Sequence, residues 1–243
     1  MKIEDGCDRF CSYCIIPTAR GRVRSRAIDD IKNEAQRLSK NGYVEIVLVG
    51  INLSAYGYGT DYNLCDAVDA VCSVDGIKRV RLGSLEPDHI TDEMLLRFKA
   101  QEKFCPQFHL SLQSGSDNTL KAMNRKYDTA FYRDFVERIR KFFDNPSITT
   151  DIMVGFAGET EEEFEDAAEF AKEIGFERLG CFAYSTEEDT PAAQLEQIDP
   201  QERKFRADAI MEQQQYTMEK YTSSRVGKTI EVLVEGFDRY AEC

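Results

Sequence analysis

The sequence has no long apolar run. A membrane-spanning helix needs about eighteen or more apolar residues in a row, and no stretch approaches that length, so we expect no membrane partner. The first residues also lack the apolar segment of a secretory signal. The first cysteine follows Met1 by only six positions, which leaves no room for a targeting peptide before it. Together these absences predict a cytoplasmic protein.

Positive charge is also in deficit. The 243 residues include 31 Lys and Arg against 44 Asp and Glu, which gives a formal net charge of −13. This charge argues against nonspecific binding of nucleic acid by the whole surface. The exception is an alternating basic run made of Arg20, Arg22, Arg24 and Arg26. Such a run either contacts an anionic partner or pairs with acidic side chains of the same chain.

Paired zinc ligands are missing as well. The chain has eight cysteines, which in a cytoplasmic protein indicate metal binding or catalysis more than disulfides. Cys7, Cys11 and Cys14 have the spacing Cys-x3-Cys-x2-Cys, and three thiolates leave one iron of a 4Fe-4S cluster open to an amine and a carboxylate. Zinc is the alternative, but it prefers two pairs of ligands, and His89 and His109 lie far along the chain.

Short β-type runs alternate with amphipathic helical segments along the chain. The predicted strands are residues 2–4, 43–49, 78–82, 107–112, 148–154 and 177–183. One of the intervening helices begins with a capping box formed by Thr160 and Glu163. Six such units predict an α/β fold with a parallel sheet, arranged either as a partial barrel or as a doubly wound sheet.

The C-terminal part departs from this alternation. A long helix is predicted from about residue 200 to residue 223, and residues 228–235 are predicted as a strand. One strand after a helix cannot bury its own apolar face. We therefore predict a main domain over residues 1–225 and the start of a second, truncated domain over residues 226–243.

The cysteine motif lies in a longer string that resembles a known family. Residues 5–26 read DGCDRFCSYCIIPTARGRVRSR, with the aromatic Tyr13 just before the third cysteine. This string resembles the cluster loop of radical S-adenosylmethionine enzymes, and within them the methylthiotransferases. Further matches are VGINL at 49–53, LQSGSD at 112–117, MNR at 123–125, and DIMVGF at 151–156 followed by GET at 158–160. The resemblance implies a partial (β/α)6 barrel, one 4Fe-4S cluster on the three cysteines and bound S-adenosylmethionine.

The resemblance also implies a substrate. Two branches of the family modify adenosine beside the tRNA anticodon, and a third modifies a ribosomal protein. Residues 20–26 and 50–57 look most like the branch that adds a methylthio group to C2 of N6-threonylcarbamoyladenosine. The alternatives are isopentenyladenosine in tRNA, a ribosomal protein, and a non-catalytic zinc-binding RNA module. The implied partners are tRNA, contacted by the four arginines of the basic run, and a flavodoxin- or ferredoxin-like electron donor.

The sequence departs from the family pattern in three places. Members carry an N-terminal domain with three more cysteines and a second 4Fe-4S cluster, and this domain is absent here. Of their C-terminal, TRAM-like RNA-binding barrel, residues 226–243 match only the first strand. Phe156 is followed by Ala-Gly-Glu-Thr, where many members have Pro-Gly-Glu-Thr. The first two departures predict that this chain is incomplete for the full reaction.

Cofactor contacts are expected at the carboxyl ends of the strands, where β/α barrels place their chemistry. The residues at these ends are Gly50, Asn52, Ser84, Glu86, Gln113, Ser114 and Asp151. By resemblance, the backbone at 50–52 meets the methionine amine of S-adenosylmethionine, and Glu86 and Gln113 lie near its ribose.

Two more residues are assigned by resemblance alone. Arg125 would pair with the methionine carboxylate, and Tyr13 would lie near the adenine. A surface salt bridge is the alternative for Arg125, and a turn-forming role is the alternative for Gln113 and Asp151.

Overall fold

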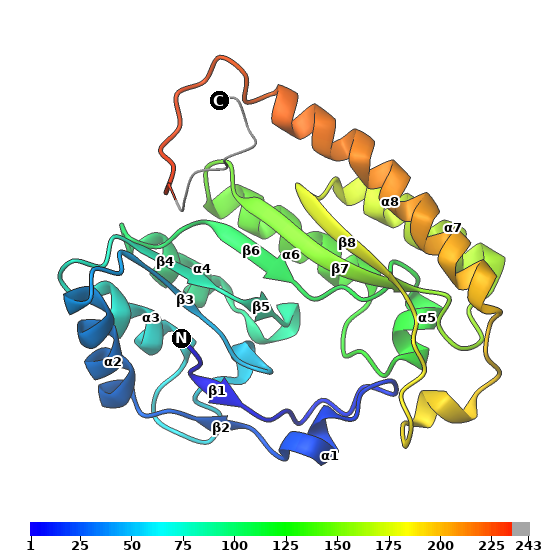
Figure 1. Ribbon diagram of the computed structural model, residues 1–243, viewed down its shortest axis with the longest axis horizontal. Helices are drawn as coiled ribbons and strands as arrows, with labels where there is room; N and C mark the ends of the chain where they lie inside the picture. Colours follow the sequence, from blue (N-terminus) through cyan, green and yellow to red (C-terminus); the bar gives the residue numbers. More distant parts are fainter. Residues whose placement is uncertain (235–243) are drawn as a thin grey trace.

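The parallel strands of the described residues lie in one curved array (Figure 1), made of a two-stranded sheet, β3–β4, and a four-stranded sheet, β5–β6–β7–β8. The computed structural model describes residues 1–234. Neighbouring strands from β3 to β8 pair in parallel. The first segment of the chain joins the edge of this array through a parallel bridge between Lys2 and Val49. The strands are β1 (Glu4–Asp5), β3 (Glu45–Leu48), β4 (Arg79–Leu82), β5 (Ser84–Leu85), β6 (Gln107–Leu110), β7 (Ser147–Val154) and β8 (Arg178–Ala183). Only Gly83 separates β4 from β5 along the chain. Val80 of β4 forms a parallel bridge with Phe104, which precedes β6, so the strands lie side by side in the order in which they occur in the sequence.

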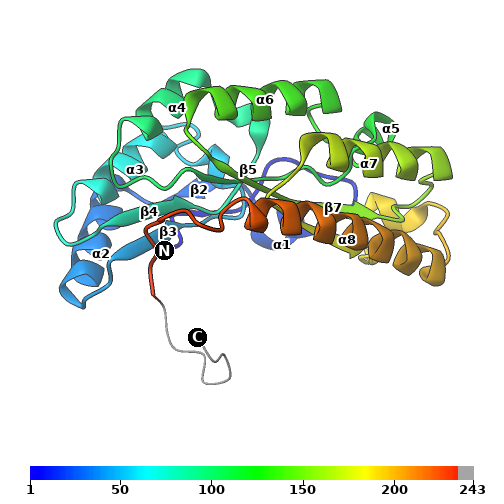
Figure 2. The same cartoon turned by 90° about the horizontal axis from the view of Figure 1, so that it is seen from above.

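Five helices cover one side of the sheet, whereas the longest helix, α8 (Pro200–Ser223), packs along β8 and lines the inner-face pocket. Figure 2 shows α2, α3, α4, α6 and α7 along the outer side of the arc. Their bounds are α2 (Ile28–Lys40), α3 (Leu64–Cys72), α4 (Asp92–Lys99), α6 (Thr129–Phe142) and α7 (Glu161–Ile174). A doubly wound sheet would carry helices on both faces. The partial (β/α)6 barrel is therefore confirmed, and in residues 1–234 no pairing closes it between β1 and β8.

Shorter elements link these layers. A two-residue strand, β2 (Arg24–Ser25), pairs antiparallel with β1, a pairing that the sequence reading did not include. The remaining elements are α1 (Ile16–Arg20), α5 (Asp117–Ala122) and the 3-10 turns η1 (Leu53–Ala55), η2 (Pro87–His89) and η3 (Pro191–Gln194). None of the helices in the described part of the chain is long and apolar enough to cross a bilayer.

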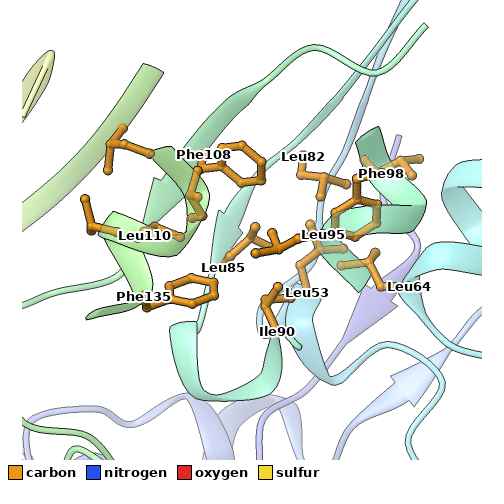
Figure 3. Close-up of a cluster of buried hydrophobic side chains, with 14 of the residues drawn as sticks. Leu53, Leu64, Leu82, Leu85, Ile90, Leu95, Phe98, Phe108, Leu110 and Phe135 are labelled. Carbon is orange, nitrogen blue, oxygen red and sulfur yellow. The ribbon is translucent and has the colours of Figure 1, made fainter. Parts of the chain in front are cut away.

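The apolar core lies between the sheet and its helical layer. Strand side chains that point outward are buried, as in β7, where buried and half-buried residues alternate along the whole strand. Figure 3 shows Leu82, Phe98, Phe108, Leu110 and Phe135 pointing toward one another from strands and helices. Polar inward-pointing residues, among them Arg81, His109, Thr149 and Asp151, line a pocket of about 640 Å³.

Capping residues mark the first turns of the last two helices, α7 and α8. The predicted capping box of α7 is present, because Thr160 Oγ1 accepts from the Glu163 N–H and the Glu163 side chain accepts from the Thr160 N–H. The predicted long helix is α8 (Pro200–Ser223), which Asp199 caps. This helix buries Ala207 and Ile210 against the rest of the core.

The strand predicted at 228–235 is wrong for the residues that the structure describes. Residues 228–234 form no strand, and Ile230, Val232 and Val234 are exposed. No neighbouring strand within residues 1–234 offers them the hydrogen bonds that a strand needs. Residues 235–243 lie outside the described residues, so the second domain stays a prediction.

Candidate functional site

The cysteine loop, residues 7–14, follows β1 and is fixed by backbone hydrogen bonds. The Cys7 N–H donates to Gly21 O at 3.0 Å, and the Ser12 N–H donates to Met123 O at 3.1 Å. The Asn124 side-chain amide donates to Phe10 O at 2.7 Å. The loop therefore rests on the segment after α5, although more than a hundred residues separate the two in the sequence.

The three thiols of this loop are not in disulfides. Cys11 is buried, whereas Cys7 and Cys14 are half-buried. Burial raises the pKa of the Cys7 and Cys14 thiols, and the neighbouring Cys11 adds to the rise. No three His, Cys, Asp or Glu side chains among residues 1–234 converge closely enough to hold a metal ion. The fit to an iron–sulfur cluster therefore rests on the donor set, since thiolates are the ligands that such clusters use.

Arg125 is the centre of a buried polar cluster beside these thiols. Its side chain is only 2% exposed, so the surface-salt-bridge alternative is wrong. Nη1 donates to Cys11 Sγ at 3.3 Å and to the Tyr13 hydroxyl at 3.4 Å, and Nε donates to the Tyr127 hydroxyl at 3.0 Å. Nη2 pairs with the Glu86 carboxylate. The structure thus brings Tyr13, Glu86 and Arg125 together around Cys11.

Tyr127 completes this cluster and was missed by sequence reasoning. Its hydroxyl contacts Arg125 and the Ser111 carbonyl oxygen, and burial raises its pKa. A tyrosine two residues after a candidate arginine is a weak signal in one sequence. Burial also raises the pKa of Tyr13. Both hydroxyls therefore stay protonated and act as neutral hydrogen-bonding groups.

Glu4 holds the segment at the carboxyl end of β3 and was also missed. Its Oε2 accepts from the Asn52 N–H at 2.7 Å, and the residue is 1% exposed. Burial raises the pKa of this carboxyl group. A Cβ added to Gly50 would lie 2.4 Å from Glu4 Oε2, so only glycine fits there without a shift. Gly50 and Asn52 are thus positioned by a buried carboxyl group.

Arg9 is a second buried arginine of the cysteine loop, and nothing in the cysteine spacing indicated it. It pairs with Asp88 and lies 3.5 Å from Glu86. Arg9 and Asn52 line a pocket of about 250 Å³, with Arg22 and Lys126 among the other lining residues. Arg9 is 6% exposed and Asn52 is 5% exposed.

Other predicted residues lie outside this cluster. Ser84 is exposed, whereas Ser114 is fully buried and accepts from the Ser116 N–H at 3.2 Å, as a turn residue does. Gln113 has a φ of 72°, and its N–H donates to Asp151 O at 3.0 Å. This bond and the one from the Met153 N–H to Gln113 O form a parallel bridge to β7, so Gln113 extends the sheet; its predicted ribose contact and the turn-forming alternative both stay predictions.

The placement of Asp151 at a strand end is wrong. Strand β7 continues to Val154, so Asp151 lies in its middle. Its carboxylate is 3.5 Å from His109 Nε2 and lines the inner-face pocket, not the pocket beside the cysteines. The strand predicted at 148–154 already includes Asp151 in its interior, so the assignment of Asp151 to a strand end did not follow from the sequence pattern.

Most of the basic run pairs with acidic side chains. Three pairs form: Arg22 with Asp8 at 3.4 Å, Arg24 with Asp5 at 3.3 Å, and Arg26 with Glu34 at 2.6 Å. The Arg22 side chain is 83% exposed, and Arg20 is also exposed. Exposed ion pairs are weak, so Arg20 and Arg22 are accessible to an anionic partner, whereas Arg26 is also held by the Lys2 and Asp30 carbonyl oxygens.

Comparison with known proteins identifies the family. The profile described as the Radical SAM superfamily matches residues 1–171. The chain belongs to this superfamily. A structure of the radical S-adenosylmethionine methyltransferase TsrM from Kitasatospora setae, with cobalamin and a 4Fe-4S cluster, has a TM-score of 0.64 and 14% identity. That match covers 79% of this chain and 38% of the other, and it supports the radical SAM fold alone.

Two curated relatives carry the name tRNA-2-methylthio-N(6)-dimethylallyladenosine synthase. The protein of Clostridium novyi (strain NT) is 42% identical over 239 residues, which cover 97% of this chain and 53% of the relative. The protein of Clostridium botulinum (strain Loch Maree / Type A3) is 39% identical over 245 residues, which cover 100% and 54%. This radical SAM chain therefore spans about half the length of the curated relatives it matches.

Proposed function

We propose that this chain is the radical SAM core of a tRNA methylthiotransferase, which adds a methylthio group to C2 of an N6-modified adenosine beside the anticodon. The observation that carries the proposal is the 42% identity to a tRNA methylthio-adenosine synthase over 97% of the chain. The buried Arg125, with the half-buried Glu86 and Tyr13 beside it, lies next to a loop of three thiols that are not in disulfides, and this arrangement supports the same chemistry.

The proposed substrate nucleoside is N6-dimethylallyladenosine, because the similar curated relatives are named for it. This replaces the threonylcarbamoyladenosine branch that residues 20–26 and 50–57 had favoured. The names also favour tRNA over a ribosomal protein. The source of the sulfur is a second cluster, which the family carries in an N-terminal domain, and the electron donor is a flavodoxin- or ferredoxin-like protein.

The residues of the chain have separate roles in this proposal. Cys7, Cys11 and Cys14 would hold a 4Fe-4S cluster, and Arg125 donates a hydrogen bond to one of these sulfurs. With S-adenosylmethionine bound, the cluster supplies one-electron radical chemistry. Glu86 fixes the Arg125 guanidinium, so its hydrogen bond to Cys11 keeps one orientation. The half-buried Tyr13 and the buried Tyr127 contact Arg125 through their hydroxyls and help to hold its guanidinium in place.

Metal analysis tests the cluster assignment. We expect the anaerobically reconstituted chain to hold about four irons, and Cys11→Ala to lose them while keeping its circular dichroism spectrum. Cys65→Ala is the matched control, because Cys65 is also a buried cysteine but lies in α3, away from the loop. Retention of iron by Cys11→Ala at the level of the control would overturn the assignment.

Product analysis tests the substrate. The reduced, reconstituted chain is incubated with S-adenosylmethionine and with tRNA that carries either dimethylallyladenosine or threonylcarbamoyladenosine. We expect 5′-deoxyadenosine by mass spectrometry, at a higher yield with the dimethylallyl form. A higher yield with the threonylcarbamoyl form would assign the chain to that branch instead, and equal yields would contradict both assignments.

A further inference from the structure

Two exposed aromatic residues lie at the cysteine loop and beside it. Phe10 belongs to the loop and is 57% exposed, and Tyr58 is 77% exposed. Single exposed aromatic residues are common on protein surfaces, so exposure alone indicates nothing. These two residues share more than exposure, because each has a fixed backbone and each lies beside exposed cations.

The backbone of Phe10 is fixed although its side chain is exposed. Its φ is 54°, in the left-handed region that glycine and asparagine adopt at the lowest cost. The Asn124 side-chain amide donates to Phe10 O at 2.7 Å, and Asn124 Oδ1 accepts from Lys126 Nζ at 2.7 Å. The loop therefore presents an aromatic ring at a position where the backbone alone favours a smaller residue.

Tyr58 lies on a turn that is also held by hydrogen bonds. The Tyr58 N–H donates to Ala55 O at 3.0 Å, and the Gly57 N–H donates to Ser25 Oγ at 2.8 Å. Gly57 has a φ of 85°, and a Cβ added there would lie 2.0 Å from Tyr62 O, so only glycine fits. The turn fixes the backbone of Tyr58 and leaves its ring in contact with solvent.

Both aromatic residues belong to one surface. Tyr58 lines the pocket of about 250 Å³ beside the cysteine loop, with Arg22 and Lys126 among the other lining residues. Phe10 is joined to Lys126 through Asn124. We call Phe10, Tyr58, Arg22 and Lys126 the aromatic–basic rim.

The cations of the rim are opposite in sign to the net charge of −13 of the chain. Arg22 pairs with Asp8 only at 3.4 Å and is 83% exposed, and the exposed Lys126 bonds only the neutral Asn124 amide among the described residues. Exposed rings that lie among cations suit an unpaired stretch of RNA, because its bases stack on the rings and its phosphates meet the cations. An acidic protein would use the cations alone.

We propose that the aromatic–basic rim binds unpaired bases of an RNA loop. Phe10 and Tyr58 stack on bases, and the two cations contact the neighbouring phosphates. The inference rests on the proposed function, which makes the anticodon loop of tRNA the partner. The contact does not depend on the N6 substituent, since stacking uses the face of a base. Cations alone would bind a duplex as well as a loop.

Fluorescence anisotropy with the reconstituted chain tests the rim without any turnover. The probes are a labelled anticodon stem-loop without N6 modification and a fully paired hairpin of the same length. We expect Phe10→Leu and Tyr58→Leu each to weaken binding of the stem-loop about fivefold or more, and to leave binding of the hairpin within about twofold. Phe10→Tyr and Tyr58→Phe keep the ring and should keep the affinity. Tyr43→Leu is the matched control, because Tyr43 is 58% exposed but lies at the amino end of β3, away from the cysteine loop.

The salt dependence of binding separates the cations from the rings. Lys126→Met should weaken both RNAs and lower the slope of log affinity against log salt by about 0.7 to 0.9, as the loss of one phosphate contact does. Phe10→Leu should leave this slope unchanged. Lys141→Met, which removes an exposed lysine of α6, is the control for the charge.

The outcomes separate the rim from the proposed function. If Phe10→Leu loses its iron, Tyr58→Leu decides the test, because Tyr58 lies outside the cysteine loop. Equal loss of affinity for the stem-loop and the hairpin, or no loss for either, in the Leu variants would overturn the rim, even if 5′-deoxyadenosine formation with tRNA supports the proposed function. Slower reduction of the cluster by flavodoxin in these variants, with unchanged RNA affinity, would assign the rim to the electron donor and exclude RNA.

Discussion

Arg206 and Arg9 are equally buried, yet their surroundings differ. Arg206 lies where α8 meets the start of α7, and its side chain is 6% exposed. All three of its nitrogens pair with carboxylates, Nε with Glu202 at 2.8 Å, Nη1 with Glu159 at 2.9 Å and Nη2 with Glu161 at 3.1 Å. Arg9, in the cysteine loop, leaves two nitrogens without partners. The complete pairing of the Arg206 nitrogens fits a structural role at the junction, a pairing that Arg9 does not reach among the described residues.

Arg125 lies between these two cases. Each of its nitrogens has a partner, as in Arg206, but one of these partners is a thiol of the cysteine loop. The cysteine region therefore contains one arginine whose nitrogens are all paired within the protein, and one, Arg9, with two nitrogens that have no partner among the described residues. The following experiments test this contrast between the cysteine region and the junction of α7 and α8.

The largest effect is expected at the junction. Arg206→Met leaves the Glu159 carboxylate, which is fully buried, without its cation, so we expect the free energy of unfolding to fall by about 3–5 kcal/mol. Urea unfolding followed by circular dichroism measures this. Arg133→Met, which removes a half-exposed pair with Glu173, should cost at most about 1 kcal/mol. Equal losses in the two variants would show that the junction is not held by its buried ion pair.

A smaller effect is expected in the cysteine region. Tyr127→Phe removes the hydroxyl that accepts from Arg125 Nε and contacts Ser111 O, so we expect a loss of about 1–3 kcal/mol in the free energy of unfolding. Tyr58→Phe is the control, because Tyr58 is 77% exposed. If Tyr127→Phe is as stable as the control, the buried cluster does not depend on complete pairing.

A third change tests the junction through its helix cap. Thr160→Ala removes the Oγ1 that accepts from the Glu163 N–H at 3.2 Å, and we expect a loss of about 1 kcal/mol in unfolding free energy. Thr160→Ser keeps the oxygen and should retain most of the stability. Equal unfolding midpoints for the Ala and Ser variants would show that the cap contributes nothing beside the Arg206 pairs.

The smallest change is expected in the pH dependence of stability. Burial raises the pKa of Glu4 in the folded state, so its ionisation opposes folding as pH rises from its ordinary pKa to its folded pKa. Glu4→Gln should therefore make the free energy of unfolding vary less with pH between the ordinary and the folded pKa of Glu4. It should also raise the free energy of unfolding at neutral pH. Glu165→Gln on the exposed face of α7 is the control. Parallel stability curves for wild type and Glu4→Gln from pH 4 to 8 would contradict the prediction.

The sequence by itself determined the features that depend on neighbouring residues. Alternation of strands and helices, the capping box of α7, the limits of α8 and the spacing of the three cysteines all follow from residues a few positions apart. Burial of outward-facing strand residues also followed, because side-chain direction alternates within a strand. These patterns are local, so one sequence contains the information needed to read them.

Only the tertiary structure decided the rest. The placement of α2, α3, α4, α6 and α7 on one side of the sheet selected the barrel, and residues 228–234 have no strand to pair with in the described part of the chain. The contact between Arg125 and Cys11 joins residues 114 positions apart, and the unpaired N–H groups of Arg9 depend on where Asp88 and Glu86 lie. Contacts of this kind are set by the packing of distant segments, which no local spacing in the sequence specifies.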